Sequence, residues 1–300
     1  MDGLEVLIQA GSGPINLADL SGSGGTNQVG GNSAQETPAP SSSSSNKESV
    51  ETSSADSTES ATDSATEASE SASLVPEGSS NAVTSGTFSQ EPSDRVYTCK
   101  SEYIDFSKSD AMSKFSFVWC PENAYQTQDS VVWKLTQQCG TTMVYPWDFH
   151  YGRIEARVRI GAGSGVVTAL LLLGPAPSDE IDFEWVGRDL THVQTMYYVQ
   201  AHRIEATSQA FGISQNKDSD LSTTYQDYAI ELLEDSVKWY LNGKLLRTLN
   251  KGADEFPSDA SRAKMGIWDG TQTGGWAGSV DWSKGPFTAE MQWFNFTPYC

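Results

Sequence analysis

Three successive β-strand patterns lie in YGRIEARVRIGAGSGVVTALLLLGPAPSDEIDFEWVG, residues 151–187. Residues 151–160 alternate strictly between apolar and charged side chains, which is typical of a strand buried on one face. Residues 166–173 are almost continuously apolar and end before two prolines, so they predict a strand buried on both faces and not a helix. Residues 180–186 alternate again, with carboxylates at every second position.

Further short strand patterns follow toward the C-terminus. They cover residues 192–200, 236–241, 244–249, 263–268 and 290–296. Asn242-Gly243 separates two of them and is a strong β-hairpin signal. Residues 225–234 are the one stretch that is compatible with a helix, and they alternate about as well as a strand does. Many short antiparallel strands at regular spacing predict an all-β sandwich or barrel.

The first 94 residues differ in composition from the rest of the chain. They consist mainly of Ser, Thr, Gly, Ala, Pro and acidic residues, with almost no aromatic or branched aliphatic side chains after Leu20. Such a segment cannot bury enough apolar surface to offset its ordering entropy. We therefore expect a disordered, acidic, Ser/Thr-rich tail over residues 1–94 and one globular domain over residues 95–300, where all nine Trp residues lie.

The formal net charge of -20 sits largely in the tail and argues against nucleic acid and anionic membranes as partners. A neutral, hydroxyl-rich ligand suits an acidic, Trp-rich domain, because aromatic faces stack on sugar rings without a charge on the ligand. The alternative for each Trp is core packing. We expect no metal, no cofactor and no membrane span, and we expect a monomer because a flexible acidic tail disfavours tight assembly.

Cysteine usage indicates an oxidising compartment. The four cysteines lie in the globular part, and none forms a CxxC pair, which argues against a zinc ribbon or a redox motif. Their even number and wide spacing predict two disulfides with three possible connectivities. We favour Cys120 with Cys139, which leaves Cys99 to join the start of the domain to Cys300 at its end.

Other features bear on secretion. The first twenty residues lack the basic and apolar regions of a signal peptide, so either the true start is missing, which we favour, or the cysteines are reduced. The Ser/Thr-rich tail is typical of an O-glycosylated extracellular spacer. One N-glycosylation sequon begins at Asn295 and is followed by Pro298. We expect a secreted glycoprotein.

A row of carboxylates carries the chemistry. The period of two places Glu180, Asp182 and Glu184 on one face of a strand, while the apolar residues between them anchor its other face in the core. Acidic residues are depleted in strands and like charges on one face repel, so this row lowers stability and indicates function. The alternatives are a solvated strand face and a calcium site, but calcium would need ligands from a flexible loop.

The spacing of the row suits a retaining glycosidase, which needs two carboxyl groups about 5 to 5.5 Å apart. The Cα atoms of Glu180 and Glu184 are about 13 Å apart on a strand. Two Glu side chains that lean toward each other over the shorter Asp182 close most of that gap. The charge of Asp182 would also separate the pKa values of the pair, so that one carboxyl is a base and the other an acid.

The motif DEIDFEWVG, residues 179–187, resembles the active-site strand of glycoside hydrolase family 16. This family of concanavalin-like jelly-roll β-sandwich enzymes includes licheninases, plant xyloglucan transglycosylases and fungal Crh-type cell-wall transglycosylases. Supporting matches are FHYGRIEARV (149–158), HVQT (192–195), YLNG (240–243), KMGIWDG (264–270), GWAG (275–278) and DWS (281–283). The C-terminal matches and Trp185 are most similar to the Crh branch, whose members transfer chitin segments onto cell-wall β-glucan.

The resemblance implies that Glu180 is the nucleophile, Asp182 its electrostatic helper and Glu184 the general acid/base. It also implies sugar contacts from Lys264, Trp268, Trp276, Gln194 and Tyr197. The chain departs from the pattern at Met196, where relatives commonly carry Asn. Its Ser/Thr-rich region precedes the catalytic domain instead of following it, and no Cys-rich chitin-binding module is present in the sequence.

The resemblance predicts a retaining transglycosylase of the cell wall, with chitin as donor, β-glucan as acceptor and a covalent glycosyl-enzyme as intermediate. Two alternatives remain open, an endo-β-1,3(4)-glucanase that hydrolyses its substrate and a non-catalytic lectin on the same sandwich. The motif does not distinguish a sugar hydroxyl from water as the attacking group. The preference for transfer therefore depends on the Crh resemblance alone.

Overall fold

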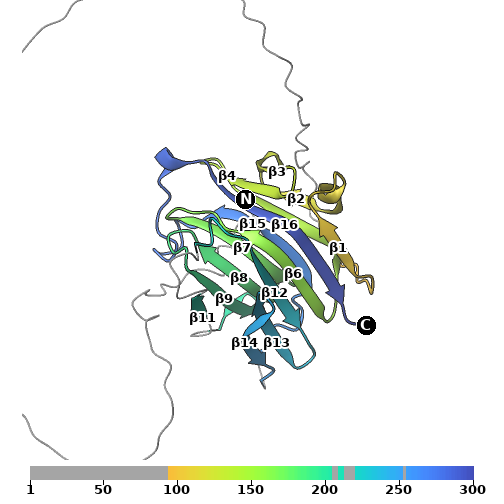
Figure 1. Ribbon diagram of the computed structural model, residues 1–300. Coiled ribbons are helices and arrows are strands. Elements are labelled where there is room, and N and C mark those ends of the chain that lie inside the picture. The colour runs from red at the N-terminus through yellow and green to blue at the C-terminus, as the bar shows by residue number, and fades with distance from the viewer. Residues whose placement is uncertain (1–93, 205–208, 213–219, 253–254) are drawn as a thin grey trace, which may run out of the picture. The chain divides into compact units, whose positions relative to one another are not determined.

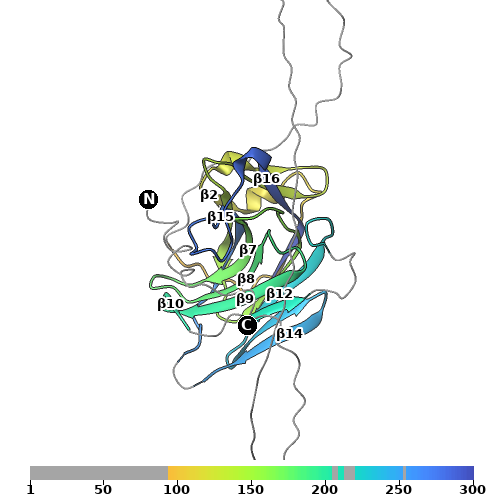
Figure 2. The same ribbon diagram turned by 90° about the vertical axis from the view of Figure 1, so that its left-hand side faces the viewer.

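The computed structural model describes residues 94–204, 209–212, 220–252 and 255–300. In these residues, two antiparallel sheets of eight strands each lie against one another as a sandwich (Figures 1 and 2). This confirms the predicted all-β jelly-roll class. The tail expected over residues 1–94 lies outside the described residues, apart from Asp94.

The first sheet contains, in spatial order, β14 (Lys244–Asn250), β13 (Ser236–Leu241), β12 (Gln226–Leu232), β6 (Gly152–Arg159), β16 (Phe287–Pro298), β4 (Val131–Leu135) and β3 (Ala124–Gln126), with β1 (Glu102–Asp105) also paired to β16. The second contains β10 (His202–Arg203), β9 (His192–Val199), β8 (Glu180–Val186), β7 (Val166–Leu173), β15 (Arg262–Asp269), β5 (Thr141–Asp148) and β2 (Ser116–Val118), with β11 (Gln209–Gly212) also paired to β9. Short 3₁₀ helices are η2 (Ala111–Lys114), η3 (Pro121–Asn123) and η4 (Trp282–Lys284). No helix of the described part is long and apolar enough to cross a membrane.

The strand predictions from residue 151 onward are confirmed. The ambiguous stretch at 225–234 contains β12, because Gln226–Leu232 pairs with β6 on one side and β13 on the other. The predicted hairpin is closed by Asn242 and Gly243, whose φ angles of 49° and 74° are both in the left-handed region that a type I′ turn requires. The strands β1 to β5, before residue 151, were not predicted.

The main core lies between the two sheets. On β6 the apolar residues Ile154, Ala156 and Val158 are buried, while the charged residues between them are half-buried on the outer face. On β8 the residues Ile181, Phe183 and Trp185 are fully buried and belong to the same core cluster. Since β8 turns these side chains inward, its carboxylates stand on the outer face of the second sheet.

The four cysteines pair as Cys99–Cys300 and Cys120–Cys139, with Cα atoms 5.8 and 6.3 Å apart. This is the connectivity that the sequence favoured. The first disulfide joins Cys99, just before β1, to Cys300, two residues after β16, so it connects the beginning of the described domain to its end. The second joins two loops of the same region, 19 residues apart in sequence.

Replacing both Cys99 and Cys300 by Ser is expected to lower the free energy of unfolding by about 5 kcal/mol, because the bond constrains the unfolded chain over 201 residues of sequence separation. The matched control replaces Cys120 and Cys139. The loss in this control should be about 2 kcal/mol smaller, because the Cys120–Cys139 bond closes a loop of 19 residues and the Cys99–Cys300 bond a loop of 201. Denaturant unfolding of both variants and the oxidised parent measures the difference. Equal losses would contradict it.

Candidate active site

The carboxylate row lies on the outer face of β8. Asp182 has no exposed surface, Glu180 is 5% exposed and Glu184 is half-buried. On β9 the three carboxylates face Tyr198, Met196 and Gln194 in register, in that order from Glu180 to Glu184. The structure therefore brings the three predicted side chains to one face, as the period of two requires.

The other neighbours of the row come from β7 and β15. Leu173, Leu171 and Ala169 of β7 pair with Glu180, Asp182 and Glu184. Lys264 of β15 pairs with Leu171, so it stands level with Asp182 two strands away, about 10 Å across the sheet. Its positive charge lowers the pKa of Glu180 and opposes the larger effect of burial.

The middle carboxylate is the one that the backbone holds. Asp182 Oδ1 accepts a hydrogen bond of 2.9 Å from the Met196 N–H. The main-chain carbonyl of Asp182 accepts one of 2.9 Å from Trp239 Nε1, which reaches it from β13 through the core. Asp182 Oδ2 is buried and has no hydrogen-bond partner among the described residues. Asp182 is therefore anchored through Oδ1 and through its main-chain carbonyl, while its buried Oδ2 accepts no hydrogen bond from the described residues.

Burial raises the pKa of all three carboxyl groups. For Glu180 and Glu184 the negative charge of Asp182 raises the pKa further, and the two glutamates have pKa values well above the usual range. For Asp182, burial raises the pKa to about 7, and the Met196 N–H bond is the largest opposing effect, ahead of the charge of Arg247. Asp182 thus has the most support for its charged form. Its charge in turn favours a protonated neighbour.

An indole pair forms the wall at one end of the row. Trp268 and Trp276 are 7% and 6% exposed, and their ring centroids are 6.2 Å apart with an interplanar angle of 30°. Trp276 Nε1 donates a hydrogen bond of 2.8 Å to Gln194 Oε1. This bond joins the loop after β15 to β9 beside Glu184. Lys264, Trp268, Trp276 and Gln194, for which the resemblance implies sugar contacts, all lie on the carboxylate side of the sheet.

Tyr197 is on the opposite face, which corrects its expected placement. It pairs with Ile181 and belongs to the core between the sheets. Tyr198 stands on the carboxylate face in its place, beside Glu180, and burial together with the three carboxylate charges raises its pKa. Counting by two from Gln194 along β9 gives Met196 and Tyr198, so the alternation rule identifies the correct tyrosine.

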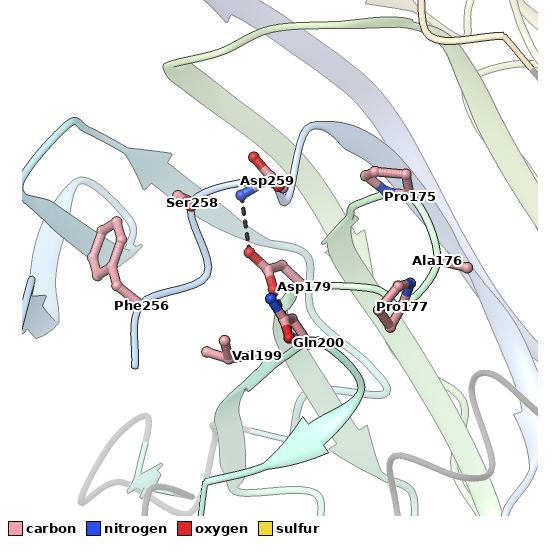
Figure 3. A pocket seen from close by; sticks show the side chains of 9 residues that line it. All are labelled: Pro175, Ala176, Pro177, Asp179, Val199, Gln200, Phe256, Ser258 and Asp259. Carbon is pink, nitrogen blue, oxygen red and sulfur yellow. Dashed lines mark hydrogen bonds between the residues drawn. The ribbon is translucent and has the colours of Figure 1, made fainter. Parts of the chain in front are cut away.

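Asp179, the residue before Glu180, connects neighbouring loops through its carboxylate, a role that the sequence analysis did not predict. Asp179 Oδ1 accepts from the Gln200 N–H at 2.9 Å, and Oδ2 accepts from the Asp259 N–H at 3.0 Å. Figure 3 shows Asp179 between the Pro175–Pro177 loop and the segment that carries Phe256 and Ser258, at the wall of a pocket of about 360 Å³. Asp179 therefore ties three loops together at the nucleophile end of β8.

A second pocket, of about 350 Å³, opens beside Trp268 at the start of β5 and the end of β15. Its polar lining includes the exposed amides of Gln137, Gln138 and Gln272, and the half-buried Trp119 adds an indole. Gln137 and Gln138 immediately precede Cys139, so the Cys120–Cys139 disulfide supports this rim. The pocket lies on the β15 side of the carboxylate row.

Comparison with known proteins agrees with the geometry of the site. The profile of glycosyl hydrolases family 16 matches residues 111–284, more than half of the chain. The chain belongs to this family. Among curated relatives, the probable glycosidase CRR1 of Saccharomyces cerevisiae is 34% identical in an alignment of 182 positions that covers 53% of this chain and 42% of the relative. The Crh-like protein UTR2 of Candida albicans is 30% identical in an alignment of 152 positions that covers 47% of this chain and 30% of the relative.

The chain thus spans less than half the length of these two fungal relatives. A bacterial beta-glucanase of Brevibacillus brevis is 26% identical in an alignment of 204 positions that covers 61% of this chain and 72% of the relative. Among solved structures, the apo Crh5 transglycosylase has a TM-score of 0.61 at 23% identity, over 69% of this chain and 87% of that one. At this identity the structural match shows the shared fold.

Proposed function

We propose that the chain is a retaining transglycosylase, which cleaves a β-linked cell-wall polysaccharide with chitin as the donor and transfers the cleaved segment to β-glucan. The observation that carries the enzymatic part is the row Glu180, Asp182 and Glu184 on one strand face, with the middle residue buried and anchored. The similarity to Crh-like fungal proteins supports transfer. The similarity to a bacterial beta-glucanase supports glucan hydrolysis as the second candidate.

In the first step of the proposed mechanism, one glutamate acts as nucleophile and the other as general acid. Glu180, ionised, donates an electron pair to the anomeric carbon, and the bond from that carbon to the glycosidic oxygen breaks. Glu184, protonated, gives its proton to the leaving oxygen. The product is a glycosyl ester of Glu180. The raised pKa of Glu184 suits it to hold this proton near neutral pH. The positive charge of Lys264 lowers the pKa of Glu180 and so favours the ionised form of the nucleophile.

The second step reverses the roles. Glu184 is now a carboxylate and takes the proton of an incoming hydroxyl, whose oxygen attacks the anomeric carbon and releases Glu180. A sugar hydroxyl gives transfer, and water gives hydrolysis. Asp182 stays ionised between them. In the first step its negative charge favours the protonated form of Glu184. Once the glycosyl ester has formed on Glu180, Asp182 no longer faces a negative charge there, because the ester is neutral.

The donor chain is proposed to run across the strands from β8 toward β15. On this path it passes Lys264 and the Trp268–Trp276 pair and reaches the pocket of Gln137, Gln138 and Gln272. Amide groups there can exchange hydrogen bonds with hydroxyl or acetamido groups. Gln194 and Tyr198 border the row on the β9 side. We further propose that the protein acts outside the cell as a monomer, with the two disulfides suited to that compartment.

The proposed activity is tested by incubating the full chain with chitin oligosaccharides, with and without a fluorescent laminari-oligosaccharide. We expect labelled hybrid products whose formation requires the acceptor. Shortened chitin without hybrids would indicate a hydrolase. Reducing ends released from β-1,3 or mixed-linkage glucan, with chitin untouched, would favour the glucanase. Binding of a glycan without turnover would indicate the non-catalytic lectin.

A further inference from the structure

Arg247 is a buried arginine that the proposed mechanism does not use. It is 8% exposed and lies on β14 in the first sheet, but its guanidinium reaches β9 in the second. Its Nη1 donates to Thr195 Oγ1 at 2.9 Å and to the Thr195 carbonyl at 3.1 Å. Within the described residues, the ion pairs found do not include Arg247. A buried cation with neutral partners is costly, so its position requires a reason.

Two hydrogen bonds made by the Thr195–Met196 peptide connect Arg247 to Asp182 in the carboxylate row. The carbonyl of Thr195 and the N–H of Met196 belong to the same planar, conjugated peptide unit and point in opposite directions. Arg247 donates to the carbonyl, and the N–H donates to Asp182 Oδ1 at 2.9 Å. A cationic donor on the carbonyl polarises the peptide and strengthens the N–H as a donor. The guanidinium thus acts on Asp182 without touching it.

Arg247 also contacts the second group that holds Asp182. Its guanidinium carbon lies 4.6 Å from the ring centroid of Trp239, whose Nε1 donates to the Asp182 carbonyl. One cation therefore contacts the Thr195–Met196 peptide, whose N–H is one hydrogen-bond donor to Asp182, and the ring of Trp239, which carries the other. The charged and titratable groups around Asp182 come from five strands: Glu180 and Glu184 on β8, Tyr198 on β9, Arg203 on β10, Lys264 on β15 and Arg247 on β14.

We propose that Arg247 is a positioning residue, which acts through the Thr195–Met196 peptide to hold Asp182 in the ionised form and in the orientation that the flanking glutamates need. This inference rests on the proposed roles of the carboxylates. The charge of Arg247 lowers the pKa of Asp182 against the effect of burial, in agreement with this geometry. The proposal also makes β14, which carries none of the carboxylates, part of the support of the site.

The test compares Arg247→Met, which keeps the apolar stem, with Arg247→Lys, which keeps the charge. The titration of the Asp182 carboxyl carbon, followed by ¹³C NMR and assigned with Asp182→Asn, needs no turnover. We expect Arg247→Met to raise its midpoint by about one pH unit, because the charged form loses its cation, and Arg247→Lys to raise it less. The same variant should move the acidic limb of kcat/KM upward and reduce kcat/KM about tenfold near pH 6 with KM little changed.

Stability separates this role from a structural one. A buried ionic group replaced by an apolar side chain of similar volume is often neutral or stabilising, so the melting temperature of Arg247→Met should stay near that of the parent while its titration moves. An unshifted Asp182 midpoint in folded Arg247→Met overturns the proposal, whatever the substrate of the enzyme is. If Arg247→Met does not fold, Arg247→Gln takes its place, because it removes the charge but keeps a donor for the Thr195 carbonyl, and an unshifted midpoint there overturns the proposal. A shifted midpoint with parental kcat/KM would instead count against the carboxylate roles.

Discussion

Glu180→Gln is expected to reduce turnover by about 10⁴-fold or more, because the amide cannot form the covalent glycosyl ester on which the mechanism depends. The substitution keeps the size of a side chain that is 5% exposed, so the fold should be retained. The matched control is Glu234→Gln, an exposed glutamate in the turn between β12 and β13. Initial rates on the preferred donor, with melting temperatures of both variants, measure the effect.

A donor with an activated leaving group separates Glu180 from Glu184. Such a leaving group departs without a proton, so Glu184→Gln should still form the glycosyl-enzyme but release it slowly. Mass spectrometry of the intact protein should then show an adduct on Glu184→Gln and none on Glu180→Gln. An adduct on Glu180→Gln, or rates within tenfold of the parent, would rule out Glu180 as the nucleophile.

Asp148→Ala is expected to lower the free energy of unfolding by about 3 to 5 kcal/mol, which is the usual effect of removing one partner of a buried ion pair. Asp148 has no exposed surface at the end of β5 and accepts hydrogen bonds from Arg262 at 2.6 Å and from Arg95 at 2.8 Å. Ser261 Oγ and the Val96 N–H complete its shell at 2.9 and 3.1 Å. Truncation removes the buried carboxylate that Arg262, with a side chain 1% exposed, shares with Arg95.

The control for Asp148 is Asp227→Ala. Asp227 pairs with Arg157 at 2.8 Å, but both side chains are partly exposed, at 29% and 38%, so the loss should stay below about 1 kcal/mol. Denaturant unfolding at neutral pH measures both variants. A loss at Asp148 no larger than that at Asp227 would mean that the buried cluster contributes little. Neither change touches the carboxylate row, so the activity of the folded fraction should be retained.

Local patterns predicted those parts of the fold that depend on local chemistry. The alternation of residues 151–160, the apolar run at 166–173 and the Asn242-Gly243 turn each became the expected element, because strand periodicity and turn backbone angles are properties of adjacent residues. The short strands β2 and β3, of three residues each, have too few positions to show a period. Their pairing is determined by the strands beside them.

The same limit applies to the site. The row of Glu180, Asp182 and Glu184 could be predicted because its members are neighbours on one strand. Arg247 could not, since its bond to Thr195 spans 52 residues and passes between sheets. Nor could the pair of Asp148 and Arg262, which are 114 residues apart. From sequence alone, a basic residue in a strand is predicted to be exposed to solvent, because charged side chains are rarely buried. Its burial becomes visible only when its neighbours in the folded structure are known.

The position of β16 has a consequence for biosynthesis. Phe287–Pro298 is the last strand in the chain order, yet it lies inside the first sheet, paired with β6 on one side and with β4 and β1 on the other. Until this segment leaves the ribosome, those three earlier strands have unpaired backbone edges, which are templates for aggregation. The nascent domain therefore completes its hydrogen bonding only after its final strand is translated, and the cell must keep an incomplete sheet from associating until then.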